Sequence, residues 1–224
     1  MSSSMMPDSF PCELVTWNRS AELATDLGRA VRTSGYRPDI VVAIGRGGYV
    51  PARVVCDVLL LDLLTSIKIE HWGVAAAKKP QTIVRFPLAV DITGKRVLVV
   101  DDVTDTGDTL SVAARYLKGF DPAEVRTAVL QHKGCSGFVP DYYAELVTVW
   151  RWIIYPWAVY EDASGFVLRV LDAGPATAQE ISGALSRRFT ISLDHGMLAD
   201  ICADLVRRGT VEEVGGVFSL CTGK

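Results

Sequence analysis

The chain has 224 residues, of which 49% are hydrophobic and 22% charged, and its formal net charge is −3. This length fits one large domain, or a standard domain with a small second one, and the composition suffices to bury a core. The slightly acidic balance argues against a protein whose main partner is nucleic acid or an anionic membrane.

The five cysteines are scattered and form no Cys-x-x-Cys pair, and the three histidines are dispersed. We therefore expect neither a disulfide framework nor a zinc site. The first residues lack a basic and then apolar signal segment, and no apolar run reaches the length of a membrane span. These features predict a cytoplasmic protein without membrane contact.

The first part of the chain alternates between helical and strand patterns. Thr16 is a good N-cap for an amphipathic helix over residues 17–32, and Gly35 fits its end. Residues 39–45 are typical of a buried strand, and residues 50–60 predict a second helix with Pro51 in its first turn. Residues 66–71 and 82–86 predict a pair of strands.

Residues 96–110, RVLVVDDVTDTGDTL, are the most informative stretch of the sequence. Val97 to Val100 are apolar and mostly β-branched, which predicts a buried parallel strand that Asp101 and Asp102 then end. Residues 104–109 suit a tight loop whose N–H groups can converge on an anion, and an amphipathic helix continues from Leu110.

This order fits a sugar phosphate. Vicinal carboxylates can accept hydrogen bonds from two ribose hydroxyls, while the loop beyond them can hold a phosphate at the positive end of a helix. A Walker A loop is excluded, because its spaced glycines and Lys-Ser/Thr ending are absent. An ordinary acidic turn after a buried strand is the alternative.

The turn from Gly45 to Tyr49 is a second candidate anion site. It is rich in glycine, contains the cation Arg46 and follows a strand, so it should lie at the same sheet edge as the acid pair. Glycines that merely turn the chain would explain it as well when it is considered alone.

The second half of the α/β pattern brings a further strand and an aromatic cluster. Residues 124–131 predict a strand that ends at His132, Lys133 and Gly134. The alternation of strands and helices predicts a doubly wound, mostly parallel α/β sheet with a mixed edge. The aromatic residues between Trp150 and Trp157, beside Pro156, could form a wall for a planar heterocycle.

The stretch at residues 96–110 closely resembles the phosphoribosyl pyrophosphate (PRPP) motif of type I phosphoribosyltransferases, and the resemblance covers roughly residues 13–165. It implies that Asp101 and Asp102 hold the ribose hydroxyls and help to place Mg²⁺. It also implies that Arg46 and Gly47 bind pyrophosphate, with a cis peptide at Arg46-Gly47. The implied loop for the 5′-phosphate consists of Thr104, Asp105, Thr106, Gly107, Asp108 and Thr109.

Three positions of the chain resemble those of the family members that act on 6-oxopurines. The resemblance is closest to the xanthine-guanine and hypoxanthine-guanine phosphoribosyltransferases. Asp105 is acidic where adenine and orotate enzymes usually have a small residue, which implies a catalytic role at the N7 proton of the base. Trp152 follows Lys133 by nineteen residues and begins the segment Trp-Ile-x-x-Pro-Trp. The resemblance implies that Lys133 donates to the exocyclic oxygen, that Trp152 stacks on the purine and that the backbone of Ile153 reads its edge. A turn-stabilising Asp105, a surface Lys133 and a core Trp152 are the alternatives.

The sequence departs from the family pattern in two places. Asp108 puts a negative side chain beside the expected phosphate, which is unfavourable unless that side chain points to solvent. The segment from Lys68 to Trp72 lacks the expected Ser-Tyr pattern. In the basic segment that follows, Lys78 and Lys79 could meet pyrophosphate or lie at a solvated hairpin tip.

Beyond Asp172 the composition changes. Thr177 should cap a helix, a second helix should run from Asp194 to Arg208, and residues 210–220 predict a hairpin turning at Gly215-Gly216. This part resembles a small winged-helix module. We therefore expect a phosphoribosyltransferase domain over residues 11–170 and a winged-helix-like module over residues 172–224.

The expected protein is a purine salvage enzyme that converts PRPP and a 6-oxopurine base to a nucleoside monophosphate, with Mg²⁺ as cofactor and as a homodimer or homotetramer. The alternatives are a PRPP-sensing transcriptional regulator and a transferase for another base. The arginines of the C-terminal module are interspersed with acidic residues, so nucleic acid is not an expected partner.

Overall fold

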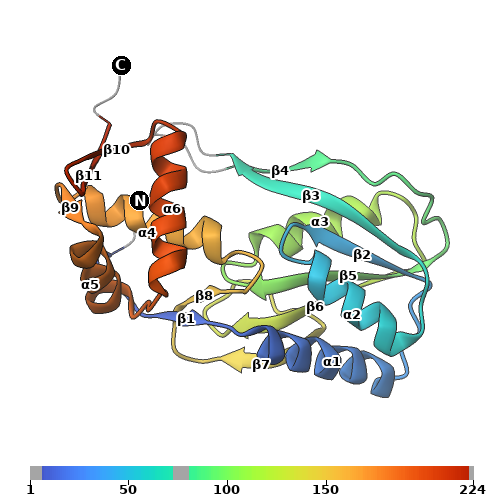
Figure 1. The fold of residues 1–224 in the computed structure, drawn as a ribbon. Helices are drawn as coiled ribbons and strands as arrows, with labels where there is room; N and C mark the ends of the chain where they lie inside the picture. The colour runs from blue at the N-terminus through green and yellow to red at the C-terminus, as the bar shows by residue number, and fades with distance from the viewer. Residues whose placement is uncertain (1–6, 73–80, 222–224) are drawn as a thin grey trace. The chain divides into compact units, whose positions relative to one another are not determined.

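A computed structural model describes residues 7–72 and 81–221 (Figure 1). Lys78 and Lys79 lie outside the described residues. The chain divides into a central unit, Trp17–Trp150, and a terminal unit made of Met1–Thr16 and Arg151–Lys224. The domain division at residues 170–172 stays a prediction.

The central unit is built on a six-stranded sheet in the order β4-β3-β2-β5-β6-β7. All neighbouring strands are parallel except β3 and β4, which are antiparallel. The mostly parallel sheet with a mixed edge is therefore confirmed. Its strands are β2 (Ile40–Gly45), β3 (Leu64–Trp72), β4 (Gln81–Phe86), β5 (Arg96–Thr104), β6 (Glu124–Lys133) and β7 (Tyr142–Val147).

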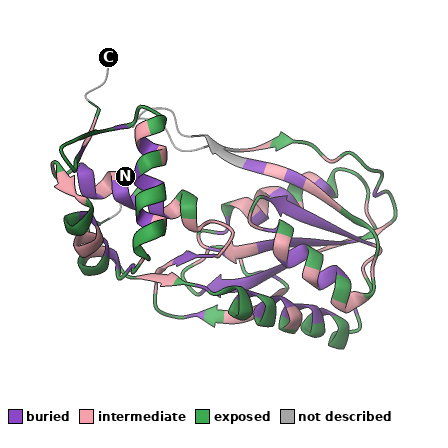
Figure 2. Cartoon of the chain, in the orientation of Figure 1, coloured by how far each residue is buried: buried purple, intermediate pink, exposed green. Residues whose placement is uncertain are grey.

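Three helices cover the sheet of the central unit: α1 (Trp17–Thr33), α2 (Tyr49–Leu59) and α3 (Asp108–Lys118). Alternate residues of β5, Val97 and Val99, pack in one buried cluster with Leu110 and Leu117 of α3. The intervening Leu98 is also fully buried, because α1 and α2 cover the opposite face (Figures 1 and 2). A sheet buried on both faces explains the continuous apolar runs of its strands.

The predicted end of the strand at the acid pair was wrong. Asp101 and Asp102 do not end the strand, because β5 continues through Thr104. The reason is that β6 also continues, so that Asp101 pairs with Val129 and Thr104 with His132. In addition, β7 was not predicted as a strand.

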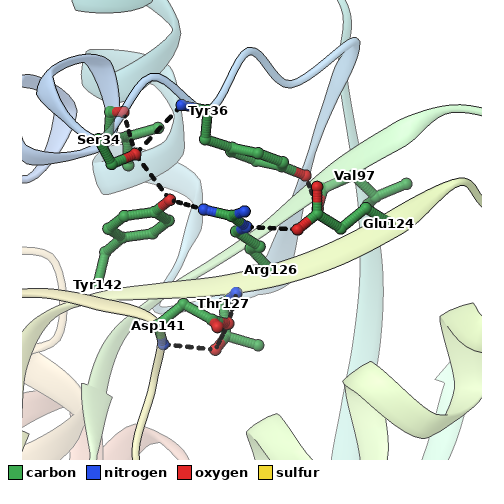
Figure 3. Close-up of polar contacts among 9 residues, drawn as sticks. Ser34, Tyr36, Val97, Glu124, Arg126, Thr127, Asp141 and Tyr142 are labelled. Atoms are coloured by element: carbon green, nitrogen blue, oxygen red, sulfur yellow. Dashed lines mark hydrogen bonds and ion pairs between the residues drawn. The ribbon is translucent and has the colours of Figure 1, made fainter.

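The amino ends of the strands are held together by a polar and aromatic network around Arg126 (Figure 3). Its guanidinium lies 4.4 Å from the ring centroid of Tyr36, and it donates to Tyr142 Oη at 2.5 Å and to Glu124 Oε1 at 2.7 Å. Burial raises the pKa of the Tyr36 phenol, which donates to the carbonyl of Val97 at 2.9 Å. This network stabilises the sheet at the amino ends of its strands. The candidate site lies at the other end of the sheet, at the carboxyl ends of the strands.

In the terminal unit, β1 (Cys12–Leu14) pairs in parallel with β8 (Trp152–Ile154), and α4 (Val159–Leu171) follows. None of these three elements was predicted. The other elements are β9 (Ala176–Thr177), α5 (Ala178–Phe189), α6 (His195–Arg207), β10 (Val211–Val214) and β11 (Val217–Leu220), and the last two strands form an antiparallel sheet with β9.

The predicted caps and turn of the last 50 residues are present. Thr177 and Glu180 form a capping box at α5, and the carboxylate of Asp194 accepts from the backbone N–H of Met197 at the start of α6. Gly215 and Gly216 both have positive φ, 60° and 83°, as the hairpin between β10 and β11 requires.

Aromatic rings pack together in the core of the terminal unit. Phe189 is fully buried, and its ring centroid lies 5.3 Å from that of Phe10 and 4.7 Å from that of Phe166.

Over the described parts of the chain, no helix is both long and apolar enough to cross a membrane. All five cysteines are free.

Candidate active site

The acid pair lies in the last part of β5, in the central unit. Asp101 is 7% exposed, and its carboxylate Oδ1 accepts from the backbone N–H of Asp102 at 3.0 Å. Burial, and secondly the neighbouring carboxylate of Asp102, raise the pKa of Asp101 well above its usual value. Two adjacent carboxylates, one of them buried, are therefore an electrostatically costly arrangement that a cation would relieve.

The glycine-rich turn between β2 and α2 meets this acid pair directly. A Cβ atom placed on Gly47 would lie 2.4 Å from Oδ2 of Asp102, and one placed on Gly48 would lie 2.3 Å from the carbonyl oxygen of Val100. Only glycine fits at these two positions without a shift of neighbouring atoms. The structure thus brings the two candidate anion sites to one edge of the sheet.

Arg46 lies in the same turn and is exposed. The peptide between Gly45 and Arg46 is cis. The expected position of the cis peptide, at Arg46-Gly47, was therefore wrong by one bond. The turn leads into α2. Because Arg46 directly follows Gly45, the last residue of β2, its charged side chain belongs to the carboxyl end of that strand.

The loop between β5 and α3 is held by contacts of its own. Gly107 has φ +93° at the N-terminus of α3, and a Cβ atom there would lie 2.5 Å from Cβ of Phe138. The carbonyl of Thr106 accepts from the backbone N–H of Gly137 at 3.0 Å. Contacts with residues 136–138 therefore stabilise the conformation of this loop before a ligand binds.

Side chains of this loop differ in exposure. Thr104 is 2% exposed, and its Oγ1 has no hydrogen-bond partner among the described residues. Asp108 is exposed, but it is not turned away from the loop, because its Oδ2 accepts from the hydroxyl of Thr106 at 3.0 Å. A carboxylate is thus bound at the N-terminus of α3, where the resemblance implies a phosphate.

Asp105 is the centre of a compact cluster. Its Oδ2 accepts from Nζ of Lys133 at 2.9 Å, and its Oδ1 accepts from the indole N–H of Trp150 at 3.3 Å. The side chain of Lys133 is 3% exposed and that of Asp105 is 35% exposed. The alternative of a surface Lys133 is therefore wrong: β6 carries this lysine into the central unit, where it is paired with the carboxylate of Asp105.

Trp150 is the residue of this cluster that sequence reasoning missed. The sequence signal was the aromatic segment after residue 149, but the family pattern points to Trp152 in that segment. The spacing of residues in the sequence does not indicate that the indole N–H of Trp150 is directed at Asp105, 45 positions earlier.

Trp152 and Ile153 lie in β8, which belongs to the terminal unit. The indole of Trp152 packs edge-to-face with Phe166, with centroids 6.5 Å apart. It also lines a cavity of about 300 Å³ together with Phe10, Arg169 and residues of α4. The expected stacking of Trp152 on the purine, and the expected reading of the purine edge by the backbone of Ile153, stay predictions.

The donor set at the acid pair is compatible with Mg²⁺. Among the described residues, no group of three or more His, Cys, Asp or Glu side chains could hold a metal ion. Mg²⁺ is commonly bound by one or two carboxylates and completes its octahedron with substrate phosphates and water. Asp101 and Asp102 match that kind of site, and the carboxylate of Asp102 lies against Gly47.

A family model described as the phosphoribosyl transferase domain matches residues 13–163. The chain belongs to the phosphoribosyltransferase family. The match includes every residue of the candidate site, from Arg46 to Ile153.

Named relatives and a solved structure agree with this membership. The hypoxanthine-guanine phosphoribosyltransferase of Schizosaccharomyces pombe is 31% identical over 100 residues, which are 37% of this chain and 48% of that protein. The xanthine-guanine phosphoribosyltransferase of Cereibacter sphaeroides is 31% identical over 137 residues, 57% of this chain and 77% of that one. The chain therefore spans about half the length of the yeast relatives that it matches.

The structure is similar to that of the purine phosphoribosyltransferase from Pyrococcus horikoshii. The TM-score is 0.59 and the identity 30%, over 65% of this chain and 93% of that one. The family and its α/β fold, expected from residues 96–110, are thus confirmed.

Proposed function

We propose that the protein transfers the 5-phosphoribosyl group of PRPP to a 6-oxopurine (guanine, xanthine or hypoxanthine) and releases pyrophosphate. The observation that carries this proposal is the 2.9 Å ion pair between Asp105, on the loop that follows the acid pair, and Lys133, at the end of β6. The carboxylate of Asp105 is an acceptor and the ammonium group of Lys133 is a donor, which complements the N7–H donor and the O6 acceptor of a 6-oxopurine. The names of the relatives, purine and guanine phosphoribosyltransferases, support the same substrate class.

In the proposed reaction the bond from the anomeric carbon to pyrophosphate breaks, and a bond from that carbon to N9 of the purine forms. Asp101 and Asp102 hold the ribose hydroxyls, and the loop of residues 104–109 binds the 5′-phosphate. Asp105 accepts the N7 proton as N9 attacks, and Lys133 donates to O6. Arg46 and Gly47 bind the departing pyrophosphate. When bound at the acid pair, Mg²⁺ would supply positive charge to that leaving group.

The test is release of pyrophosphate by the purified protein with PRPP, MgCl₂ and one of four bases: guanine, xanthine, hypoxanthine or adenine. We expect turnover with at least one 6-oxopurine and much less with adenine, because the 6-amino group of adenine offers Lys133 no acceptor. No turnover with any of the four bases would overturn the proposal.

A PRPP-sensing regulator is the second candidate, and α5, α6 and the β10–β11 hairpin favour it. Their order, two helices and then a hairpin, resembles that of a winged-helix module, which stays a proposal for this part of the chain. The cation Arg207 lies near Asp204 in α6, and Glu212 and Glu213 lie in β10, so acidic groups accompany the basic ones. Tight DNA binding without turnover would favour the regulator.

The domain limits at 11–170 and 172–224, a homodimer or homotetramer, and a cytoplasmic location complete the proposal. The free thiols of all five cysteines are compatible with a reducing compartment. Sedimentation of the full chain, alone and with PRPP, tests the oligomeric state.

A further inference from the structure

Trp150 contacts both residues that the proposed function uses to read the base. Its indole N–H donates to Oδ1 of Asp105 at 3.3 Å. The ammonium group of Lys133 lies 4.9 Å from the centroid of its ring, within the range of a cation–π interaction. All three residues belong to the central unit.

The two contacts to Asp105 approach different oxygens of the same carboxylate. Lys133 binds Oδ2 and Trp150 binds Oδ1. The torsion that turns a carboxylate about its terminal bond is soft, so a single donor leaves the plane of the group free to swing. Two donors on opposite oxygens fix that plane.

The carboxylate of Asp105 also keeps capacity for a substrate. Each carboxylate oxygen has two lone-pair sites, and each donor described here uses one of them. The side chain of Asp105 is 35% exposed, whereas that of Lys133 is 3% exposed. The partly exposed side chain of Asp105 can therefore accept a further proton donor while Lys133 and Trp150 hold its carboxylate.

We infer that Trp150 is a positioning residue, whose indole N–H orients the carboxylate of Asp105 toward N7 of the bound purine. This inference rests on the proposed function. It assigns to Trp150 a role that is distinct from the stacking expected of Trp152. Loss of the indole N–H should reduce the rate of transfer without weakening the binding of PRPP, because the acid pair and the phosphate loop are unchanged.

The first test uses Trp150→Phe, which removes the N–H and keeps an aromatic ring for Lys133. We expect kcat to fall about tenfold, with KM for PRPP within about twofold of wild type, since small errors in the position of a catalytic group are costly. Trp17→Phe is the matched control: Trp17 is 58% exposed at the first residue of α1, and the substitution should leave kcat unchanged. Thermal unfolding of each variant excludes loss of fold as the cause.

Two kinetic outcomes would overturn the inference. One is a kcat for Trp150→Phe equal to that of wild type. The other is a several-fold lower KM for the purine with unchanged kcat, which would mean that the indole competes with the base for Asp105.

A second measurement does not depend on turnover. In ¹⁵N-labelled protein the indole N–H signal of Trp150, identified by its loss in Trp150→Phe, should shift in Asp105→Ala, while that of Trp17 should not. An unshifted Trp150 signal would overturn the contact itself. A wild-type protein without transfer activity but with the expected shift would overturn the proposed function, and with it the catalytic use of this contact.

Discussion

The Cβ position of Gly47 lies 2.4 Å from Oδ2 of Asp102, so the turn after β2 and the acid pair on β5 occupy contiguous space. Real Cβ atoms do not approach another atom so closely. Residues that are 55 positions apart in the chain therefore form one surface, and a side chain at position 47 would displace the carboxylate.

Gly47→Ala should reduce kcat/KM for PRPP about 100-fold, because either the carboxylate of Asp102 or the turn at Arg46 has to move. Steady-state kinetics at varied PRPP checks this. Gly165→Ala in α4 is the matched control, since a Cβ there meets nothing within 4 Å and alanine favours a helix. Gly47→Ala with activity within twofold of wild type would contradict the assigned role of this close approach.

Asp105→Asn should lower turnover about 100-fold or more and leave PRPP affinity within about threefold, because it removes the proton acceptor and spares the phosphate loop. Calorimetric titration with PRPP, next to kinetics, separates the two effects. Lys133 loses a charged partner in this variant and its side chain is 3% exposed, so a thermal unfolding curve has to accompany the kinetics. Equal losses in turnover and PRPP affinity would count against the proton role.

Asp108→Asn should lower the KM for PRPP about fivefold, because it removes a charge whose repulsion at about 4 Å in water amounts to ~1 kcal/mol. The amide oxygen can still accept from the hydroxyl of Thr106, so the loop keeps its local hydrogen bond. The gain should shrink at 1 M salt, where charges are screened within about 3 Å. Asp26→Asn on α1, an exposed charge paired with Arg29, is the control and should not change the KM.

The pair of Asp39 and Arg96 should make stability depend on pH in the acid range. Hydrogen bonds from the Arg96 side chain, and then from its backbone N–H, lower the pKa of Asp39 from 3.8 to about 2. A lowered folded-state pKa contributes stability that is complete above the unfolded value and is lost as the pH falls toward the folded value. The urea midpoint of Asp39→Asn should therefore lie below that of wild type at pH 7, and the difference should close between pH 4 and 2. A difference that persists at pH 2 would rule out this linkage.

The sequence predicted those parts of the protein that local chemistry determines. Buried strands show as β-branched runs. Helix ends show through residues such as Thr177, whose side chain caps α5, and Gly35, whose φ is positive just after α1. The acid pair and the glycine turn could be placed at one sheet edge because parallel strands share that edge.

Contacts between distant segments were not predictable in the same way. The strand pair of β1 and β8 joins two segments of three residues, too short for a periodic pattern. β5 extends through Asp101 because its neighbour β6 extends too, which depends on pairing and not on the acids themselves. The indole of Trp150 reaches Asp105 through the fold of the central unit, and no spacing in the sequence encodes that.

The pairing of Cys12 with Trp152 has a consequence for synthesis of the chain. During synthesis β1 precedes every strand of the central sheet, yet its partner β8 is made about 140 residues later, after the last of those strands. The β1–β8 pair therefore cannot form before the whole sequence of the central sheet has been made. Pairing in the terminal unit thus follows the synthesis of the central unit, although β1 comes earlier in the chain.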